Sequence, residues 1–145
     1  MSIVSGSDCI FCEIVTGTSD SQQIYQDDTT IAFMDIHPAN DGHCLVIPKV
    51  HFETVFEMPP ATFGRVASTA AKVARVVHEV LRPGGISLVQ ANGELAGQSV
   101  FHVHVHVLPR RAGDNLLINW DRGDQLVDWG RIAEIAGRLR SRLHG

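Results

Sequence analysis

The stretch Phe101-His102-Val103-His104-Val105-His106-Val107-Leu108-Pro109 decides the fold of this chain, because histidines and apolar residues alternate along it. A period of two is typical of a β-strand, whose successive side chains point to opposite faces. The valines and Phe101 are therefore predicted to pack on a core. The other face carries His102, His104 and His106, and imidazoles in a row indicate catalysis or metal binding.

The spacing of these histidines limits what they can do together. Alternate residues of a strand are about 6.6 Å apart, so His102 and His106 are expected about 13 Å apart. A zinc ion needs its ligand nitrogens at about 2.0–2.1 Å, so one ion cannot easily use all three. We expect the histidines to divide their duties, since a neutral imidazole serves as nucleophile, acid or base near pH 7. The alternative is a polar strand face whose histidines are merely hydrogen-bonded.

Composition indicates one domain, residues 1–145, large enough to bury a core. The net charge is −4 and the basic residues are dispersed, which predicts neither a nucleic-acid partner nor a membrane partner. The first six residues lack the charged and apolar regions of a signal peptide, and no apolar run has membrane length. Three cysteines are an odd number, which disfavours a disulfide framework. We therefore expect a cytoplasmic, reducing location.

Apolar periodicity and turn residues predict the elements. Strands are expected over residues 23–26, 30–34, 44–47, 86–90 and 101–109. Helices are expected over 10–15, between the prolines at 59–60 and the breaker at 83–85, and from the N-cap residue Asp128 onward. The polar loop 92–99 precedes the histidine strand and brings Gln98 and Ser99 to its start. Its glycines let backbone N–H groups approach an anion, which predicts a phosphate site, although an ordinary turn is the alternative.

Residues 96–110 resemble the signature of the histidine-triad (HIT) superfamily of nucleotide hydrolases and transferases. Residues 33–38 and 42–51 resemble its nucleotide-pocket and second-histidine segments, and residues 9–14 resemble the start of its bacterial members. The likeness covers roughly 8–111 and leaves 112–145, with Trp120, Trp129 and a helix, as a C-terminal extension.

The resemblance implies an α+β fold with a five-stranded, mainly antiparallel sheet. A long helix, a short N-terminal helix and a C-terminal helix are expected with it, on one side of the sheet. It also implies a homodimer formed through the long helix Ala61–Arg82 and an edge strand.

The resemblance further implies a purine nucleotide hydrolase. His104 would attack the α-phosphate of a mono- or dinucleotide and form a covalent nucleotidyl-histidine. His106 would bind a phosphate oxygen, His43 would support that site, and Gln98 and Ser99 would lie near the leaving group. Asp35 would accept the ribose hydroxyls. The remaining nucleotide-binding residues would be Phe11, Phe33, Ile36 and Asn92, although Phe33 and Ile36 are equally explained as plain core.

Cys9-x-x-Cys12 has the spacing of a zinc-binding pair. The resemblance implies that His51 and His102 complete a structural zinc site, and that the reaction itself needs no catalytic metal. A reduced cysteine pair without metal is the alternative. Cys44 is expected in the core. The remaining histidines, His37, His78 and His144, are expected on loops or at the surface.

Several functions remain open. The triad region resembles the branch that cleaves dinucleoside polyphosphates, whereas the upstream half resembles nucleoside phosphoramidases. The C-terminal extension could shape the leaving-group side of the pocket. A nucleotide-binding or interaction module with little turnover is a second class of function. A metallohydrolase that uses all three histidines as ligands is a third.

Overall fold

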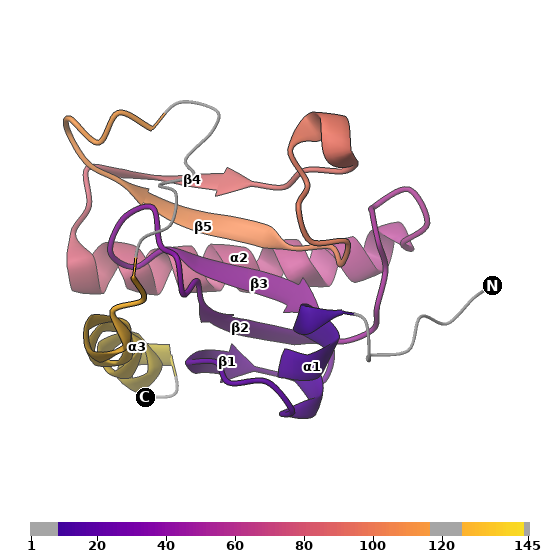
Figure 1. Cartoon of the computed structure of the whole chain (residues 1–145), viewed down its shortest axis with the longest axis horizontal. Helices are drawn as coiled ribbons and strands as arrows, with labels where there is room; N and C mark the ends of the chain where they lie inside the picture. Colours follow the sequence, from indigo (N-terminus) through magenta and orange to yellow (C-terminus); the bar gives the residue numbers. More distant parts are fainter. Residues whose placement is uncertain (1–8, 117–125, 144–145) are drawn as a thin grey trace.

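A computed structural model of the chain describes residues 9–116 and 126–143. Within them the chain forms one sheet of five strands and three α-helices (Figure 1). Trp120, His144 and the first eight residues lie outside this description. The elements are α1 (Ile10–Thr16), β1 (Gln23–Gln26), β2 (Thr30–Met34), β3 (Cys44–Pro48), α2 (Pro60–Leu81), β4 (Gly85–Val89), a 3₁₀ turn η2 (Glu94–Ala96), β5 (Val105–Arg110) and α3 (Trp129–Leu143).

The strands lie in the order β1-β2-β3-β5-β4, and each neighbouring pair is antiparallel. The last strand in sequence is thus inserted between β3 and β4, which makes it an interior strand. Leu45 lies opposite His106 in this register, and Val46 lies opposite Val105. The histidine strand is therefore flanked by a strand on both sides. Its side chains point either to the main core or to the opposite face of the sheet, which carries the histidines.

The main core lies between one face of the sheet and the helices α2 and α3. Val103, Val105 and Val107 are buried in it, as the alternation predicts. The apolar stripes of the two helices meet them, including Val66, Val73 and Val77 of α2 and Ile132, Ala136 and Leu139 of α3. Burying a side chain of this size contributes about 1.5–3 kcal/mol, so this face holds the fold together.

Phe101 departs from the expected pattern, because its side chain is 42% exposed and lies outside the core. The reason is that regular strand geometry begins only at Val105. Before it, the N–H of Val103 donates to the carbonyl oxygen of Phe52 at 2.7 Å, in a loop and not in the ladder of the sheet.

The short helix α1 lies on the other face of the sheet, in front of the strands in Figure 1. Phe11 and Cys12 pack there against Phe33, Leu45 and Ile47. The expectation of helices on one side therefore holds for α2 and α3 but not for α1. This arrangement makes α1 a wall of the face that carries the histidines.

The helix ends follow local rules. Asp128 caps α3 by accepting a hydrogen bond from the N–H of Arg131, and Gly17 ends α1 in the left-handed conformation. The sulfur of Cys9 occupies the N-cap position of α1 and accepts from the N–H of Cys12 at 3.4 Å. Over residues 9–116 and 126–143, no helix combines the length and apolar character that a membrane crossing requires.

Candidate active site and metal centre

The first two histidines of the row stand just before β5, on backbone that has not entered the sheet. The carbonyl oxygen of His102 is consequently available to a side chain, and it lies 2.7 Å from Nδ1 of His104. A carbonyl can only accept, so Nδ1 of His104 must carry the hydrogen. The lone pair of a neutral His104 is then on Nε2.

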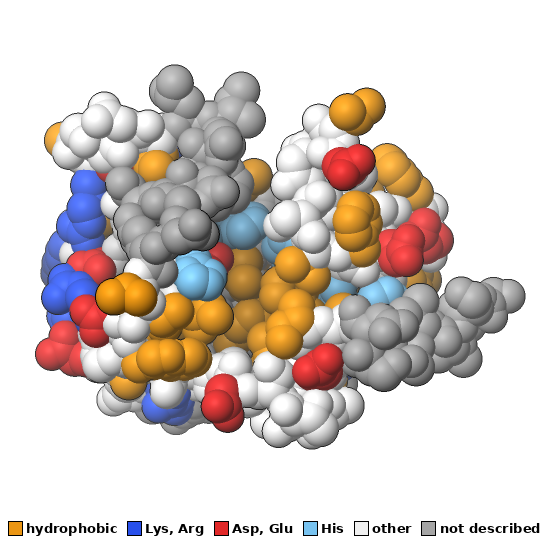
Figure 2. Space-filling view, in the orientation of Figure 1, with side chains coloured by type: hydrophobic (Ala, Val, Ile, Leu, Met, Phe, Trp, Pro, Cys, Tyr) orange, Lys and Arg blue, Asp and Glu red, His pale blue; other side chains and the backbone are white. Residues whose placement is uncertain are grey.

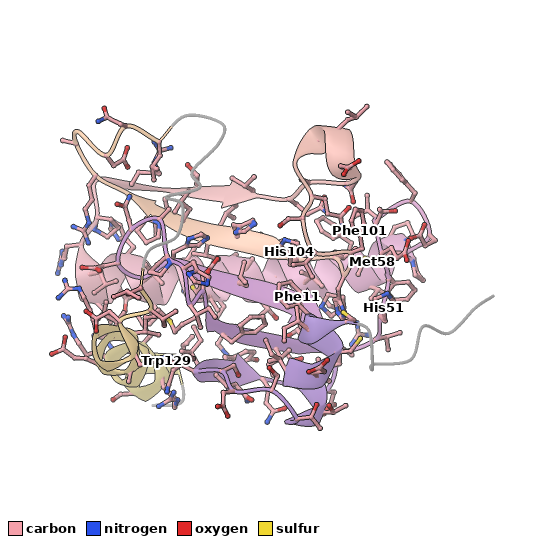
Figure 3. The ribbon with its side chains drawn as sticks, in the orientation of Figure 1. Phe11, His51, Met58, Phe101, His104 and Trp129 are labelled. Carbon is pink, nitrogen blue, oxygen red and sulfur yellow. The ribbon has the colours of Figure 1, made fainter. Side chains whose placement is uncertain are left out.

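His104 is suited to remain neutral in this environment. Its side chain is 7% exposed, and burial lowers its pKa below the usual value of a histidine. Phe11 packs edge-on against the ring, with centroids 5.1 Å apart. Figure 3 shows these two side chains meeting between α1 and β5. The arrangement presents an imidazole with one fixed tautomer beside an aromatic wall.

The third histidine belongs to a separate hydrogen-bonded chain. The N–H of Ala39 donates to Nδ1 of His43 at 3.0 Å, so the hydrogen of neutral His43 is on Nε2. That Nε2 lies 2.9 Å from Nδ1 of His106, which must accept. His106 therefore carries its own hydrogen on Nε2. Burial, with His104 and His43 nearby, lowers the pKa of His106 to about 3, so this donor is a neutral imidazole.

Asp35 lies next to this pair. One carboxylate oxygen is 3.6 Å from Nε2 of His43, and the other accepts from the N–H of His37 at 2.9 Å. Asp35 also lines a cavity of about 460 Å³ between the loop 38–42 and α3. Other lining residues include Arg111, Arg131, Ile132 and Ile135. A partly exposed carboxylate between a histidine pair and a cavity is suited to accept hydroxyl hydrogens.

A second cluster forms at the N-terminal end of the histidine row. Its donor atoms come from Cys9, Cys12, His51 and His102, and all lie within 4.8 Å of one another. Nδ1 of His102 is 3.5 Å from each sulfur, and Nδ1 of His51 is 3.2 Å from the sulfur of Cys12. Tetrahedral zinc with ordinary bond lengths places sulfur–nitrogen ligand pairs about 3.5 Å apart, which these separations match.

The tautomers and charges of this cluster also fit a metal. Nε2 of His102 donates to the carbonyl oxygen of Pro48 at 2.8 Å, which leaves the Nδ1 lone pair pointing at the sulfurs. Burial and the neighbouring Cys9 raise the pKa of the Cys12 thiol to about 11. A divalent cation relieves this cost, because coordinated thiols are deprotonated. Figure 3 shows His51 at this end of the molecule, beside sulfur atoms.

Two loop residues behave differently from the sequence expectation. The amide of Gln98 is buried and donates to the carbonyl oxygens of Glu53 and Val100, while its oxygen accepts from the N–H of Gly93. It therefore organises the loop and has no hydrogen left for a phosphate. Asn92 similarly accepts from the N–H of Val55 and donates to Gln90.

The remaining predicted residues divide between the two faces. Ser99 is exposed on the loop beside Gln98. Phe11 and Phe33 meet edge-to-face at 5.4 Å in the cluster under α1. Ile36 packs against the main core instead, so the structure does not bring it together with the two phenylalanines.

The resemblance implied that a backbone carbonyl fixes the tautomer of His104, and this acceptor is the carbonyl oxygen of His102. Sequence reasoning did not identify the other two groups that orient the rings, the N–H of Ala39 and the carbonyl oxygen of Pro48, because main-chain atoms carry no residue-type signal. Figure 2 shows histidine side chains reaching the surface in a hollow of this face, among apolar side chains.

Cys44, in contrast, is fully buried in the core as predicted, and burial raises the pKa of its thiol.

The model of the HIT domain matches residues 16–113, which is more than half of the chain. The chain belongs to the HIT family. Protein hit of Bacillus subtilis is 41% identical over 113 residues, covering 77% of this chain and 78% of that protein. Adenylylsulfatase HINT3 of Arabidopsis thaliana is 34% identical over 110 residues, covering 76% of this chain and 56% of that protein. The family thus includes nucleotide hydrolases.

A solved structure resembles nearly the whole HIT-family chain. The zinc-bound histidine triad family protein of Mycobacterium smegmatis superimposes with a TM-score of 0.82 at 34% identity. The match covers 97% of this chain and 96% of the other. Because it extends well beyond residue 113, the likeness includes the C-terminal extension.

Proposed function

We propose that this chain hydrolyses purine nucleotide esters, anhydrides or amidates at the α-phosphate through a covalent intermediate on His104. The observation that carries the proposal is the single tautomer of His104. Its Nδ1–H is fixed by the carbonyl oxygen of His102, so Nε2 holds a lone pair without any base having to remove a proton.

The reaction has two displacements. Nε2 of His104 attacks phosphorus, a P–N bond forms, and the bond to the leaving group breaks with its electron pair, which takes a proton from water. Water then attacks the same phosphorus and gives up a proton to solvent, which balances the proton taken by the leaving group. The P–N bond breaks, and its electron pair returns to Nε2 as the lone pair. Throughout both steps Nδ1–H stays on the carbonyl oxygen of His102, which stabilises the positive charge on the nucleotidyl-imidazole.

The neighbouring residues bind the substrate. Nε2–H of His106 donates to a non-bridging phosphate oxygen, in the orientation imposed by His43. Asp35 accepts the ribose hydroxyls, and Phe11 with Phe33 forms the apolar wall for the base. Ser99 is an exposed hydroxyl on the loop 92–99 and would lie near the leaving group. Gln98 holds that loop in shape through main-chain contacts.

Cys9, Cys12, His51 and His102 would hold a structural zinc ion, which supplies a crosslink between α1 and the start of the histidine row. With four protein ligands such an ion keeps no open position for substrate or water. The displacements described above use none of its chemistry.

The test is to trap the intermediate. Wild-type chain is mixed with adenosine phosphoramidate or diadenosine polyphosphate, quenched in acid and analysed by mass spectrometry. We expect an added nucleotidyl group on His104, and loss of turnover by roughly 10³-fold or more in His104→Ala. His78→Ala is the matched control, because His78 is exposed on α2.

The other candidate functions give different results. A binding module with little turnover would bind AMP but accumulate no intermediate. A metallohydrolase that uses the histidine row would lose activity on chelation and show no covalent adduct. Turnover that persists in His104→Ala would end the proposal outright.

The choice between polyphosphate and phosphoramidate depends on the cavity shared by Asp35 and α3. Ile132 and Ile135 contribute apolar surface to it, Arg111 contributes a cation, and Arg131 is paired there with Asp41. Because α3 belongs to the C-terminal extension, we propose that the extension tunes substrate choice. Ile135→Ala should change the ratio of the hydrolysis rates for polyphosphate and phosphoramidate. It should change the amount of trapped intermediate with either substrate less, as measured by parallel assays.

We also propose that the chain forms a homodimer through α2 and β4. Among the described strands β4 pairs only with β5, so its other edge offers unpaired backbone groups. Leu88 on this strand is 51% exposed. Light scattering coupled to size-exclusion chromatography should give twice the monomer mass, and a monomer mass would contradict the proposal.

A further inference from the structure

We propose that the metal cluster of Cys9, Cys12, His51 and His102 positions the nucleophile, in addition to bracing the N-terminal segment. The inference rests on the proposed role of His104. It makes the four ligands positioning residues, because they act through His104 and do not touch the substrate.

His102 is the link between the two sites. Its ring has two partners: Nδ1 faces the sulfurs of Cys9 and Cys12, and Nε2 donates to Pro48. Its main-chain carbonyl is the acceptor for Nδ1 of His104. The residue that offers a ligand to the metal thus also supplies the hydrogen bond that fixes the tautomer of the nucleophile. A change in the position of His102 must move that carbonyl.

The segment 48–53 reinforces the same link. Its carbonyl oxygens accept from the ring of His102 at Pro48, from the N–H of Val103 at Phe52, and from the amide of Gln98 at Glu53. His51 lies in the middle of this segment. Among the described residues, the sulfur of Cys12 is the polar partner of its ring, and its buried Nε2 has none. Because Nδ1 is the ring atom that faces this sulfur, at 3.2 Å, a metal ion bound to Nδ1 would hold His51, and with it the segment that aligns residues 98–104.

The third connection runs through α1. Cys9 caps this helix and Cys12 lies in its first turn, next to Phe11. The ring of Phe11 packs edge-on against both His102 and His104, with centroid separations of 6.0 and 5.1 Å. Fixing the two sulfurs therefore fixes the aromatic wall beside the nucleophile.

The pair His43–His106 provides an internal reference. Its tautomers are set from the other end of the site by the N–H of Ala39, and it has no ligand in the metal cluster. Metal loading should consequently change the tautomer population of His104 and leave the tautomer of His106 unchanged. A general loosening of the protein would act on both.

The experiment uses the full chain labelled with ¹⁵N-histidine, at fixed neutral pH, with zinc content determined by elemental analysis. Long-range ¹H–¹⁵N spectra identify which ring nitrogen carries hydrogen. With one equivalent of zinc we expect a single tautomer for His104, with its hydrogen on Nδ1. After chelation we expect tautomer averaging at His104 alone, weaker binding of AMP, and turnover reduced about 10- to 100-fold, as for other partners that orient a site.

Cys9→Ser keeps the experiment decisive if chelation unfolds the wild type. Serine is a good N-cap residue, so α1 retains its cap while zinc binds more weakly. Zinc can then be titrated into folded protein. The signal of the His104 tautomer with hydrogen on Nδ1 should rise in proportion to bound zinc. Leu139→Ala, a core truncation in α3, is the control for lost stability and should leave the signal unchanged.

The outcomes separate the two proposals. A His104 spectrum that is identical with and without zinc overturns the positioning role, even if the trapped intermediate establishes His104 as the nucleophile. Conversely, a zinc-dependent spectrum together with full turnover in His104→Ala supports the coupling and refutes the proposed function. Equal changes at His104 and His106 reduce the metal to a general brace and also overturn the inference.

Discussion

Two clusters of potential metal ligands lie on the same face of the sheet, and they differ in what their histidines can offer. Cys9, Cys12, His51 and His102 form one; Asp35, His43 and His106 form the other. Both sets of donor atoms lie within 4.8 Å, so proximity alone does not distinguish them.

The difference lies at the second nitrogen of each ring. His102 donates Nε2–H to Pro48, which frees the lone pair on Nδ1 for a metal. His43 instead accepts at Nδ1 from the N–H of Ala39, so its Nε2 carries a hydrogen that is already directed at His106. A hydrogen bond on the remote nitrogen therefore makes one cluster a ligand set and the other a chain of donors.

The largest expected effect is on metal content. Wild-type chain should bind one equivalent of zinc, and Cys9→Ala with Cys12→Ala should bind none, because two of the four ligands are gone. His43→Asn should still bind one equivalent, since the second cluster contributes no site. Elemental analysis after dialysis measures all three proteins. A second equivalent that disappears in His43→Asn would break the distinction.

The next effect concerns the donor chain. His43→Asn removes the hydrogen bond that fixes His106, so the proposed phosphate donor loses its preferred tautomer. We expect kcat to fall about 10- to 100-fold, the usual cost of losing an orienting partner. Steady-state kinetics of His78→Asn provide the control. An unchanged kcat would show that His106 needs no orientation from His43.

The loop that places His43 depends on Gly42. This residue has φ +90, and a Cβ there would clash with Cδ1 of Leu81 and lie 3.2 Å from Cγ of Pro109. Gly42→Ala should lower the free energy of unfolding by about 1–3 kcal/mol through backbone strain, with the clash in addition. Gly64→Ala is the opposite case, because it lies in α2 with open space around it and should stabilise by about 0.5–1 kcal/mol. Denaturant unfolding of both variants measures the contrast.

The smallest effect is a pH dependence of stability. Burial lowers the pKa of His106 to about 3, whereas an unfolded histidine titrates near its ordinary value of 6.5. The unfolded state therefore binds the proton first, and stability present above about pH 6.5 declines steadily as the pH falls toward 3. His106→Asn should flatten this decline relative to wild type in thermal melts. Parallel curves for the two proteins would contradict the low pKa.

Sequence periodicity was sufficient for the framework of the molecule. The strands β1 and β2 occupy the predicted residues, and the valine face packs on α2, because burial of apolar side chains decides both. The Cys-x-x-Cys pair also lies close to His51 and His102, as the resemblance implied.

The sequence could not reveal how side chains share their hydrogen bonds. Gln98 looked like a phosphate donor, yet two main-chain carbonyls take its hydrogens. For Ile36 a pocket position and a core position were equally expected, and it packs against the main core. In each case the competing partner is a backbone group or a packing direction, which depends on the folded chain and not on residue type.

The late start of β5 has a consequence for how far this protein can be stabilised. Its ladder with β3 begins at Val105, which leaves the carbonyl of His102 outside the sheet and available to the ring of His104. A strand that began three residues earlier, at His102, would gain ladder bonds and lose that acceptor. Evolution or design toward a more regular sheet would thus oppose the proposed activity of His104, and the irregular entry into β5 is a segment that selection for stability alone would remove.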